Sequence, residues 1–107
     1  MNGSGIFVVR SVVADPADRA AFDEWYQTDH MPDALATFGA RRGWRCWNLD
    51  DPSVHTAYYM FDDTNGLASI EGSAGLKRLV ADFDGRWGDR VTRTREATRV
   101  VDMQATA

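Results

Sequence analysis

The chain has 107 residues, and we expect residues 1–107 to form one domain. Its net charge of −4 and pI near 5 argue against a surface that follows nucleic-acid phosphates, so we expect no nucleic-acid partner. No stretch reaches the roughly 20 apolar residues of a membrane span, and the start lacks the features of a signal peptide. With one cysteine that cannot pair internally, we expect a cytoplasmic protein that does not associate with membranes.

Cys46 has no neighbouring cysteine or histidine at a spacing typical of metal ligands, and we interpret it as a small buried apolar residue. His30, His55 and Cys46 do not combine at a helix or turn spacing suited to coordination, so we expect no metal site. The sequence also contains no fingerprint for a nucleotide, flavin or haem. We therefore expect a protein without a cofactor.

The first half of the chain begins with a strand and continues with a helix. Residues 6–14 are rich in β-branched side chains and predict a strand. Asp15 then supplies a helix N-cap, with Pro16 at the first helical position. Pro32 disfavours helical backbone at the residue before it and should break or kink this helix near His30. A shorter helical stretch can follow before a glycine ends it.

The second half supplies three strands and another helical region. Residues 43–49 and 54–61 predict a strand pair, and residues 91–103 predict the last strand. Between them a helical region follows Asn65-Gly66, with Ser73 as the cap of its longer part. The order β-α-β-β-α-β is the ferredoxin-like α+β arrangement, a four-stranded antiparallel sheet with both helices on one face.

Both faces of the predicted sheet are apolar. The first strand has apolar residues at odd and even positions, and the middle strands place Trp44 opposite Trp47 and Tyr58 opposite Tyr59. An antiparallel sheet with one solvated face should instead alternate apolar and polar residues. The helices can cover only one face, so we expect a homodimer in which two sheets pack face to face.

Titratable side chains share the apolar face of the first helix. At roughly 100° per residue, one face collects five residues, namely Phe22, Trp25, Tyr26, Asp29 and His30. The other residues of the stretch, including Asp23, fall on the opposite side. A carboxylate and an imidazole thus point toward apolar surroundings, which requires a ligand or a local structural reason.

The residues Phe22, Trp25, Tyr26, His30 and Pro32 resemble the pattern Phe-x-x-aromatic-Tyr-x-x-x-His-x-Pro of EthD-like members of the dimeric α+β barrel superfamily. The resemblance implies a sheet-to-sheet dimer with a pocket between sheet and helices in each subunit. It also implies small cofactor-independent enzymes that act on hydrophobic aromatic or polyketide-like molecules. Decarboxylases, cyclases, lactone isomerases and metal-free oxygenases are among them.

Three residues are candidates for catalysis. His30 has the pKa and the aromatic neighbours of a general acid or base, although an imidazole can also cap the last carbonyls of a helix. Tyr26 lies four residues earlier on the same face, where it could share a ligand with His30 or belong to the core. Asp29 opposes the helix dipole, so it either points inward to assist or is solvated because the helix ends earlier.

The remaining candidates are aromatic and basic. The aromatic residues that could bind substrate, or serve only as core and interface, are Phe22, Trp25, Trp44, Trp47, Tyr58 and Tyr59. His55, next to a polar loop, is expected to be exposed. Arg93, Arg95 and Arg99 share one face of the last strand, where they could meet acidic groups of a dimer mate, bind a carboxylate substrate, or face solvent.

These features favour a small homodimeric enzyme that binds a hydrophobic small molecule. In this hypothesis His30 moves a proton on an aromatic or enolisable substrate, in lyase or isomerase chemistry such as decarboxylation or cyclisation. A noncatalytic dimer that only binds a small molecule is one alternative. A cofactor-free oxygenase is another.

Overall fold

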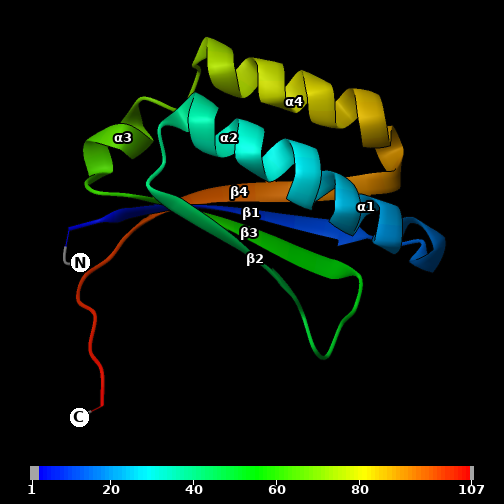
Figure 1. The fold of residues 1–107 in the computed structure, drawn as a ribbon, viewed down its shortest axis with the longest axis horizontal. Helices are drawn as coiled ribbons and strands as arrows, with labels where there is room; N and C mark the ends of the chain where they lie inside the picture. The colour runs from blue at the N-terminus through cyan, green and yellow to red at the C-terminus, as the bar shows by residue number, and fades with distance from the viewer. Residues whose placement is uncertain (1–2, 107) are drawn as a thin grey trace.

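A computed structural model describes residues 3–106, and it contains a four-stranded sheet covered on one face by helices (Figure 1). In chain order the elements are β1 (Gly5–Val13), a 3₁₀ turn (Pro16–Asp18), α1 (Arg19–Trp25), a π-helical turn (Tyr26–His30), α2 (Met31–Phe38), β2 (Arg42–Trp47), β3 (Val54–Phe61), α3 (Thr64–Ala68), α4 (Ala74–Trp87), a 3₁₀ turn (Gly88–Arg90) and β4 (Val91–Arg99). The strand order is β2-β3-β1-β4, and every neighbouring pair is antiparallel. The predicted ferredoxin-like α+β fold is confirmed.

The predicted ends of the helices are largely confirmed because they depend on local capping. The Asp15 side chain accepts a hydrogen bond from the Ala17 N–H, and the Ser73 hydroxyl accepts one from the Leu76 N–H. Gly39 ends α2 with a φ of 68°, in the left-handed region that favours glycine. The start of the second helical region was predicted too late, because the Asp63 side chain already caps α3.

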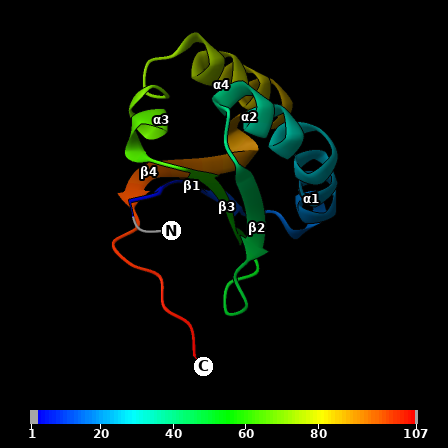
Figure 2. The same cartoon turned by 60° about the vertical axis from the view of Figure 1, so that its left-hand side comes forward.

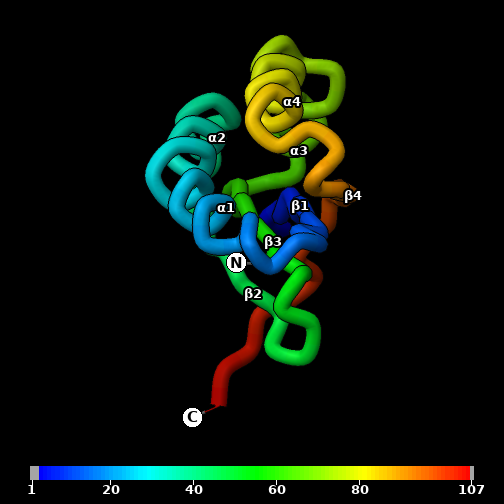
Figure 3. The backbone as a smooth tube through the Cα atoms, turned by 90° about the vertical axis from the view of Figure 1, so that its right-hand side faces the viewer, coloured from blue at the N-terminus to red at the C-terminus, as the bar shows by residue number. Residues whose placement is uncertain are grey.

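Two strands are shorter than predicted. β2 ends at Trp47, because the Asn48 side chain accepts hydrogen bonds from two backbone N–H groups of the following turn. β4 ends at Arg99 instead of residue 103. In Figure 3, α2 and α4 lie on one side of the sheet, and the chain beyond β4 runs away from its other side.

The core lies between the sheet and the helices, as Figure 2 shows from a second side. Odd-numbered residues of β1 point into it, and the aromatic residues at its centre are Phe7, Phe22, Tyr26, Tyr59, Phe83 and Trp87. Within residues 3–106, no helix covers the other face of the sheet. A broad concavity there has Val8, Trp44 and Tyr58 in its lining, and the two aromatic rings stack with centroids 5.2 Å apart.

Two sequence expectations about burial were wrong. Cys46, expected to be a buried apolar residue, lies on the outer face of β2 and is exposed. His55, expected to be exposed, is completely buried under the helices. Among the described residues, none of the helices is long and apolar enough to cross a membrane.

Candidate functional site

A π-helical turn sets the direction of His30. Pro32 has no N–H to continue the α-helical pattern, and the Met31 N–H bonds instead to the Tyr26 carbonyl, five residues back. Each residue of such a turn rotates by only about 80°, compared with 100° in an α-helix. The narrower step moves His30 toward the centre of the apolar face and moves Asp29 out of it. The helix is therefore continuous where a break or kink was predicted.

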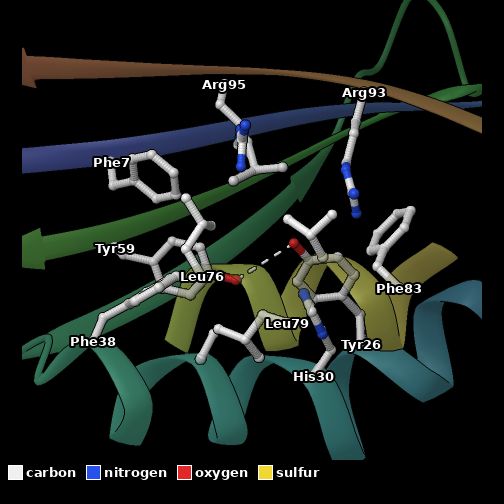
Figure 4. Close-up of a pocket in the computed structure, with 13 residues that line it drawn as sticks. Phe7, Tyr26, His30, Phe38, Tyr59, Leu76, Leu79, Phe83, Arg93 and Arg95 are labelled. Carbon is white, nitrogen blue, oxygen red and sulfur yellow. Dashed lines mark hydrogen bonds between the residues drawn. The ribbon is translucent and has the colours of Figure 1, made fainter. Parts of the chain in front are cut away.

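His30 lines a cavity between the sheet and the helices (Figure 4). The cavity is lined by Phe7, Val9, Tyr26, His30, Ala34, Phe38, Tyr59, Leu76, Leu79, Val80, Phe83, Arg93 and Arg95. Its interior leaves about 30 Å³ for the centres of water-sized molecules, enough for about two waters. A second concavity of about 290 Å³ lies outside it and shares Leu76, Val80 and Arg95. The two spaces are thus separated by these side chains, between α4 and β4.

The imidazole of His30 is held by aromatic rings. It stacks on Trp25 with centroids 4.6 Å apart, and it meets the ring of Tyr26 edge-on at 4.9 Å. Within residues 3–106 it forms no side-chain hydrogen bond. Burial, and after it the positive charge of Arg93, lower the pKa of His30 from 6.5 to about 4. At neutral pH the ring is therefore uncharged, and one of its nitrogens can accept a proton.

Two tyrosine hydroxyls stand beside this imidazole. The Tyr59 hydroxyl donates to the Tyr26 hydroxyl over 3.4 Å, a long bond for two oxygens. Burial raises the pKa of Tyr26 to about 12 and also raises the pKa of Tyr59. Both hydroxyls are protonated at neutral pH, and the proton of Tyr26 is free to be donated into the cavity.

The wall formed by β4 carries positive charge. Arg93 lies over the ring of Phe83, with its guanidinium carbon 3.9 Å from the ring centroid, and donates one hydrogen bond to Asp84 at 3.1 Å. Arg95, two residues further on, lines the cavity on the same side. Figure 4 shows both side chains pointing from β4 toward the two tyrosines and His30.

A second polar cluster, behind Tyr26, was missed by the sequence reasoning. Arg45 donates to Asp23 at 3.0 Å and contacts the Nε2 atom of His55 at 3.2 Å, and Trp47 donates to Asp23 at 2.8 Å. Because arginine can only donate, Nε2 must accept, and the neutral His55 ring carries its proton on Nδ1. Burial and the charge of Arg45 lower the pKa of His55 to about 4.

Asp23 was predicted to lie on the side of the helix opposite the apolar face, and this prediction was also wrong. Its side chain is half-buried, and the hydrogen bond from Trp47 lowers its pKa. The sequence held one signal for this cluster. His55 shares its strand parity with Ala57 and Tyr59, and all three are buried.

No family model matches the sequence, and no curated protein matches it either. Solved structures do share its architecture. An EthD family protein from Bacillus halodurans is 20% identical, with 85% of this chain and 96% of that chain covered and a TM-score of 0.60. The chain shares the fold of this protein. This confirms the fold that the five-residue pattern implied.

Two further structures share the fold of this chain. A variant of SnoaB, a cofactor-independent oxygenase from Streptomyces nogalater, is 14% identical over 94% of this chain and 96% of its own, with a TM-score of 0.65. A protein from Deinococcus radiodurans, proposed to be an antibiotic biosynthesis monooxygenase, is 10% identical over 95% of this chain and 98% of its own, with a TM-score of 0.67. At such identities the likeness concerns the fold alone.

The structure places the predicted site residues in four locations. His30, Tyr26 and Tyr59 meet at the cavity. Phe22, Trp25 and Trp47 pack in or against the core without lining the cavity, and Trp44 and Tyr58 lie on the outer face of the sheet. Asp29 is exposed and borders a shallow surface hollow with Arg86, so of the two expected directions the inward one was wrong, and Asp29 is solvated although the helix does not end before it. Within residues 3–106, no three histidine, cysteine or acidic side chains gather as they would around a metal ion.

Proposed function

We propose that the chain is a small-molecule enzyme in which neutral His30 removes a proton from a hydrophobic aromatic or polyketide-like substrate. One observation carries this proposal: a half-buried imidazole that has no side-chain hydrogen bond within residues 3–106 faces a cavity. Lyase or isomerase chemistry, including decarboxylation or cyclisation, needs only such a proton transfer together with stabilisation of the anion that forms. No cofactor takes part in the proposed reaction.

The neighbouring groups suit the anion that deprotonation creates. Removing a proton from an enolisable ketone or a phenol leaves a negative oxygen. The protonated hydroxyl of Tyr26 can donate to that oxygen, and the positive charge of Arg93 lies on the same side of the cavity. After proton transfer His30 is positively charged. Its lowered pKa therefore favours rapid release of the proton, at the cost of making it a weak base.

A substrate larger than two waters must displace side chains on its way in. Leu76, Val80 and Arg95 separate the cavity from the outer concavity of about 290 Å³. Arg95 is exposed, so its side chain can move without uncovering the core. We infer that the substrate enters between α4 and β4 and widens the cavity as it binds.

The proposal can be tested without knowing the natural substrate. 2-Tetralone, a bicyclic aromatic ketone with acidic C–H bonds, serves as the probe, and NMR follows exchange of those protons for deuterium in D₂O. We expect exchange above the buffer rate with the wild-type protein and a loss of 10²- to 10⁴-fold of the catalysed rate in His30→Ala. Asp29→Asn, one residue away on the outside, is the matched control and should keep the wild-type rate. Equal rates for wild type and His30→Ala would remove His30 from the mechanism.

A cofactor-free oxygenase is the second candidate, and the shared fold with SnoaB favours it. The same deprotonation would then deliver an electron-rich anion to molecular oxygen. An oxygen electrode distinguishes the two chemistries, because only the oxygenase consumes oxygen in the presence of substrate. Binding of aromatic probes without deuterium exchange or oxygen consumption would support the noncatalytic alternative.

We further propose that the outer face of the sheet packs against a second copy of the chain. Val8, Trp44 and Tyr58 leave an apolar surface there that no helix covers, and Trp44 is 37% exposed. Sedimentation equilibrium should give twice the mass of 11.9 kDa. Trp44→Glu would place a charge in the centre of this surface and should shift the equilibrium toward a folded monomer.

A further inference from the structure

The cavity has an unbalanced charge. Among the residues that the structure describes, only Arg93 and Arg95 line the cavity with a charge at neutral pH, since His30 is uncharged there. Asp84, the single acidic partner of Arg93, lies outside the cavity with a side chain that is 62% exposed. None of the ion pairs formed within residues 3–106 involves Arg95. The space beside the two tyrosines therefore faces two cations without an anion.

The two arginines are placed to act together. Alternate residues of a strand point to the same face, and their side chains begin roughly 6.5 Å apart. Asp84 occupies one nitrogen of Arg93, which leaves the other N–H groups available. Burial lowers the pKa of Arg93 and the charge of Arg95 lowers it further, while Asp84 raises it, so the two arginines repel each other although Asp84 partly offsets the charge of Arg93. An anionic ligand would remove that repulsion.

We propose that Arg93 and Arg95 bind a carboxylate of the substrate, which makes the substrate class an aromatic or polyketide-like acid. This inference rests on the proposed function. The two guanidinium groups would hold the carboxylate at β4, with the ring system between Phe7, Phe38 and Tyr59 and the acidic proton toward His30 on the opposite helix. Arginine suits this role because its planar fork matches the two oxygens of a carboxylate.

Salicylate and salicylamide test this, since they have the same shape and differ in charge. Titrations followed by tryptophan fluorescence and by the NMR signals of the His30 ring give both affinities. We expect salicylate to bind at least about tenfold more tightly than salicylamide. We also expect its binding to raise the pKa of His30, because an anion beside the ring offsets the charge of Arg93.

Substitutions then locate the binding groups. Arg93→Gln and Arg95→Gln should each weaken salicylate binding by about tenfold and leave salicylamide binding unchanged. Arg99→Gln is the matched control, because Arg99 lies on the same face of β4 but does not line the cavity. Arg95 is exposed, so Arg95→Gln keeps the test valid if Arg93→Gln fails to fold. The proposal is overturned by equal affinities for acid and amide, by no salicylate binding at millimolar concentration, or by an equal loss in Arg99→Gln.

The same variants separate this inference from the proposed function. If His30→Ala stops deuterium exchange in 2-tetralone while acid and amide bind equally, the proton transfer stands and the carboxylate site is wrong. If salicylate binding depends on the two arginines while His30→Ala keeps full exchange, the carboxylate site stands and the role of His30 is wrong.

Discussion

The two histidines of this chain contact the same tyrosine and have similar pKa values, but they differ in burial, hydrogen bonding and access to the cavity. Tyr26 stands between them, with ring centroids 4.9 Å from His30 and 4.6 Å from His55. Burial lowers both pKa values to about 4. His55, however, is fully enclosed and bonded to Arg45, whereas His30 is only partly buried and faces a cavity. A perturbed pKa thus marks both a structural and a candidate catalytic imidazole, and access to a cavity distinguishes them.

Replacing each histidine by alanine should give the largest difference between two variants, both in exchange rate and in the free energy of unfolding. His30→Ala should lose 10²- to 10⁴-fold of the exchange rate with a modest change in the free energy of unfolding. His55→Ala should lower the free energy of unfolding by roughly 3 kcal/mol, because it leaves a hole in the core and removes one of the two hydrogen-bond partners of Arg45, while the folded fraction keeps its exchange rate. Urea denaturation and deuterium exchange measure the two quantities. A folded His55→Ala protein without exchange would show that both histidines belong to one catalytic network.

The second prediction concerns stability against pH. Between pH 6.5 and 4 an unfolded histidine binds a proton that the folded one does not, since both folded pKa values are lowered to about 4. The free energy of unfolding should therefore fall as the pH drops through this window, by roughly 2–3 kcal/mol for each histidine at pH 4.5. His55→Asn should remove about half of this fall. Urea midpoints at pH 7 and pH 4.5 measure it, and an unchanged pH dependence in the variant would contradict the buried neutral state of His55.

Asp23→Asn removes the carboxylate between Arg45 and Trp47 and should have a smaller effect on the free energy of unfolding. The Arg45 side chain is 17% exposed and that of Asp23 is 41% exposed, so solvent already screens the pair. We expect a loss of about 1 kcal/mol together with a changed fluorescence of Trp47. Asp62→Asn, which breaks an exposed pair with Arg41, should leave stability unchanged. Equal losses in both variants would mean that the cluster around His55 has no special role.

The smallest predicted effect separates the two tyrosines. Tyr26→Phe should slow exchange by about tenfold, because its free hydroxyl proton can reach the developing anion. Tyr59→Phe should slow it by less, because this hydroxyl already donates to Tyr26. Neither change should cost more than about 1 kcal/mol of stability, since the bond between them is long. The reverse order of rates would make Tyr59 the donor to the substrate.

The fold could be predicted from the sequence because its signals are local. Asp15, Ser73 and Gly39 act within a few residues of their positions, and β-branched runs mark the strands. The five-residue pattern around His30 then indicated the correct architecture. The direction of Asp29 could not be predicted, because Pro32 signals an interruption of the helix but not a turn with one extra residue, and the α-helical spacing was applied through it.

The burial of His55 could not be predicted for a different reason. Both faces of the sheet are apolar, so the alternation of Tyr58 and Tyr59 did not show which face lies under the helices. Cys46 was assigned to the interior from its residue type alone, because free cysteines are usually buried, and it lies instead on the exposed face of β2. Which arginines of β4 line the cavity could not be predicted either. Only the packing of α4 shows that Arg93 and Arg95 border the cavity and that Arg99 does not.

The wide turn at Tyr26–His30 has one last consequence. The turn takes up one extra residue without rotating the helix that follows, because five steps of about 80° and four steps of about 100° both add up to about 400°. If the same residues were wound as a regular α-helix, everything downstream would rotate about the helix axis by roughly a quarter revolution. Met31 and Ala34, which now anchor α2 on the core, would then turn away from it.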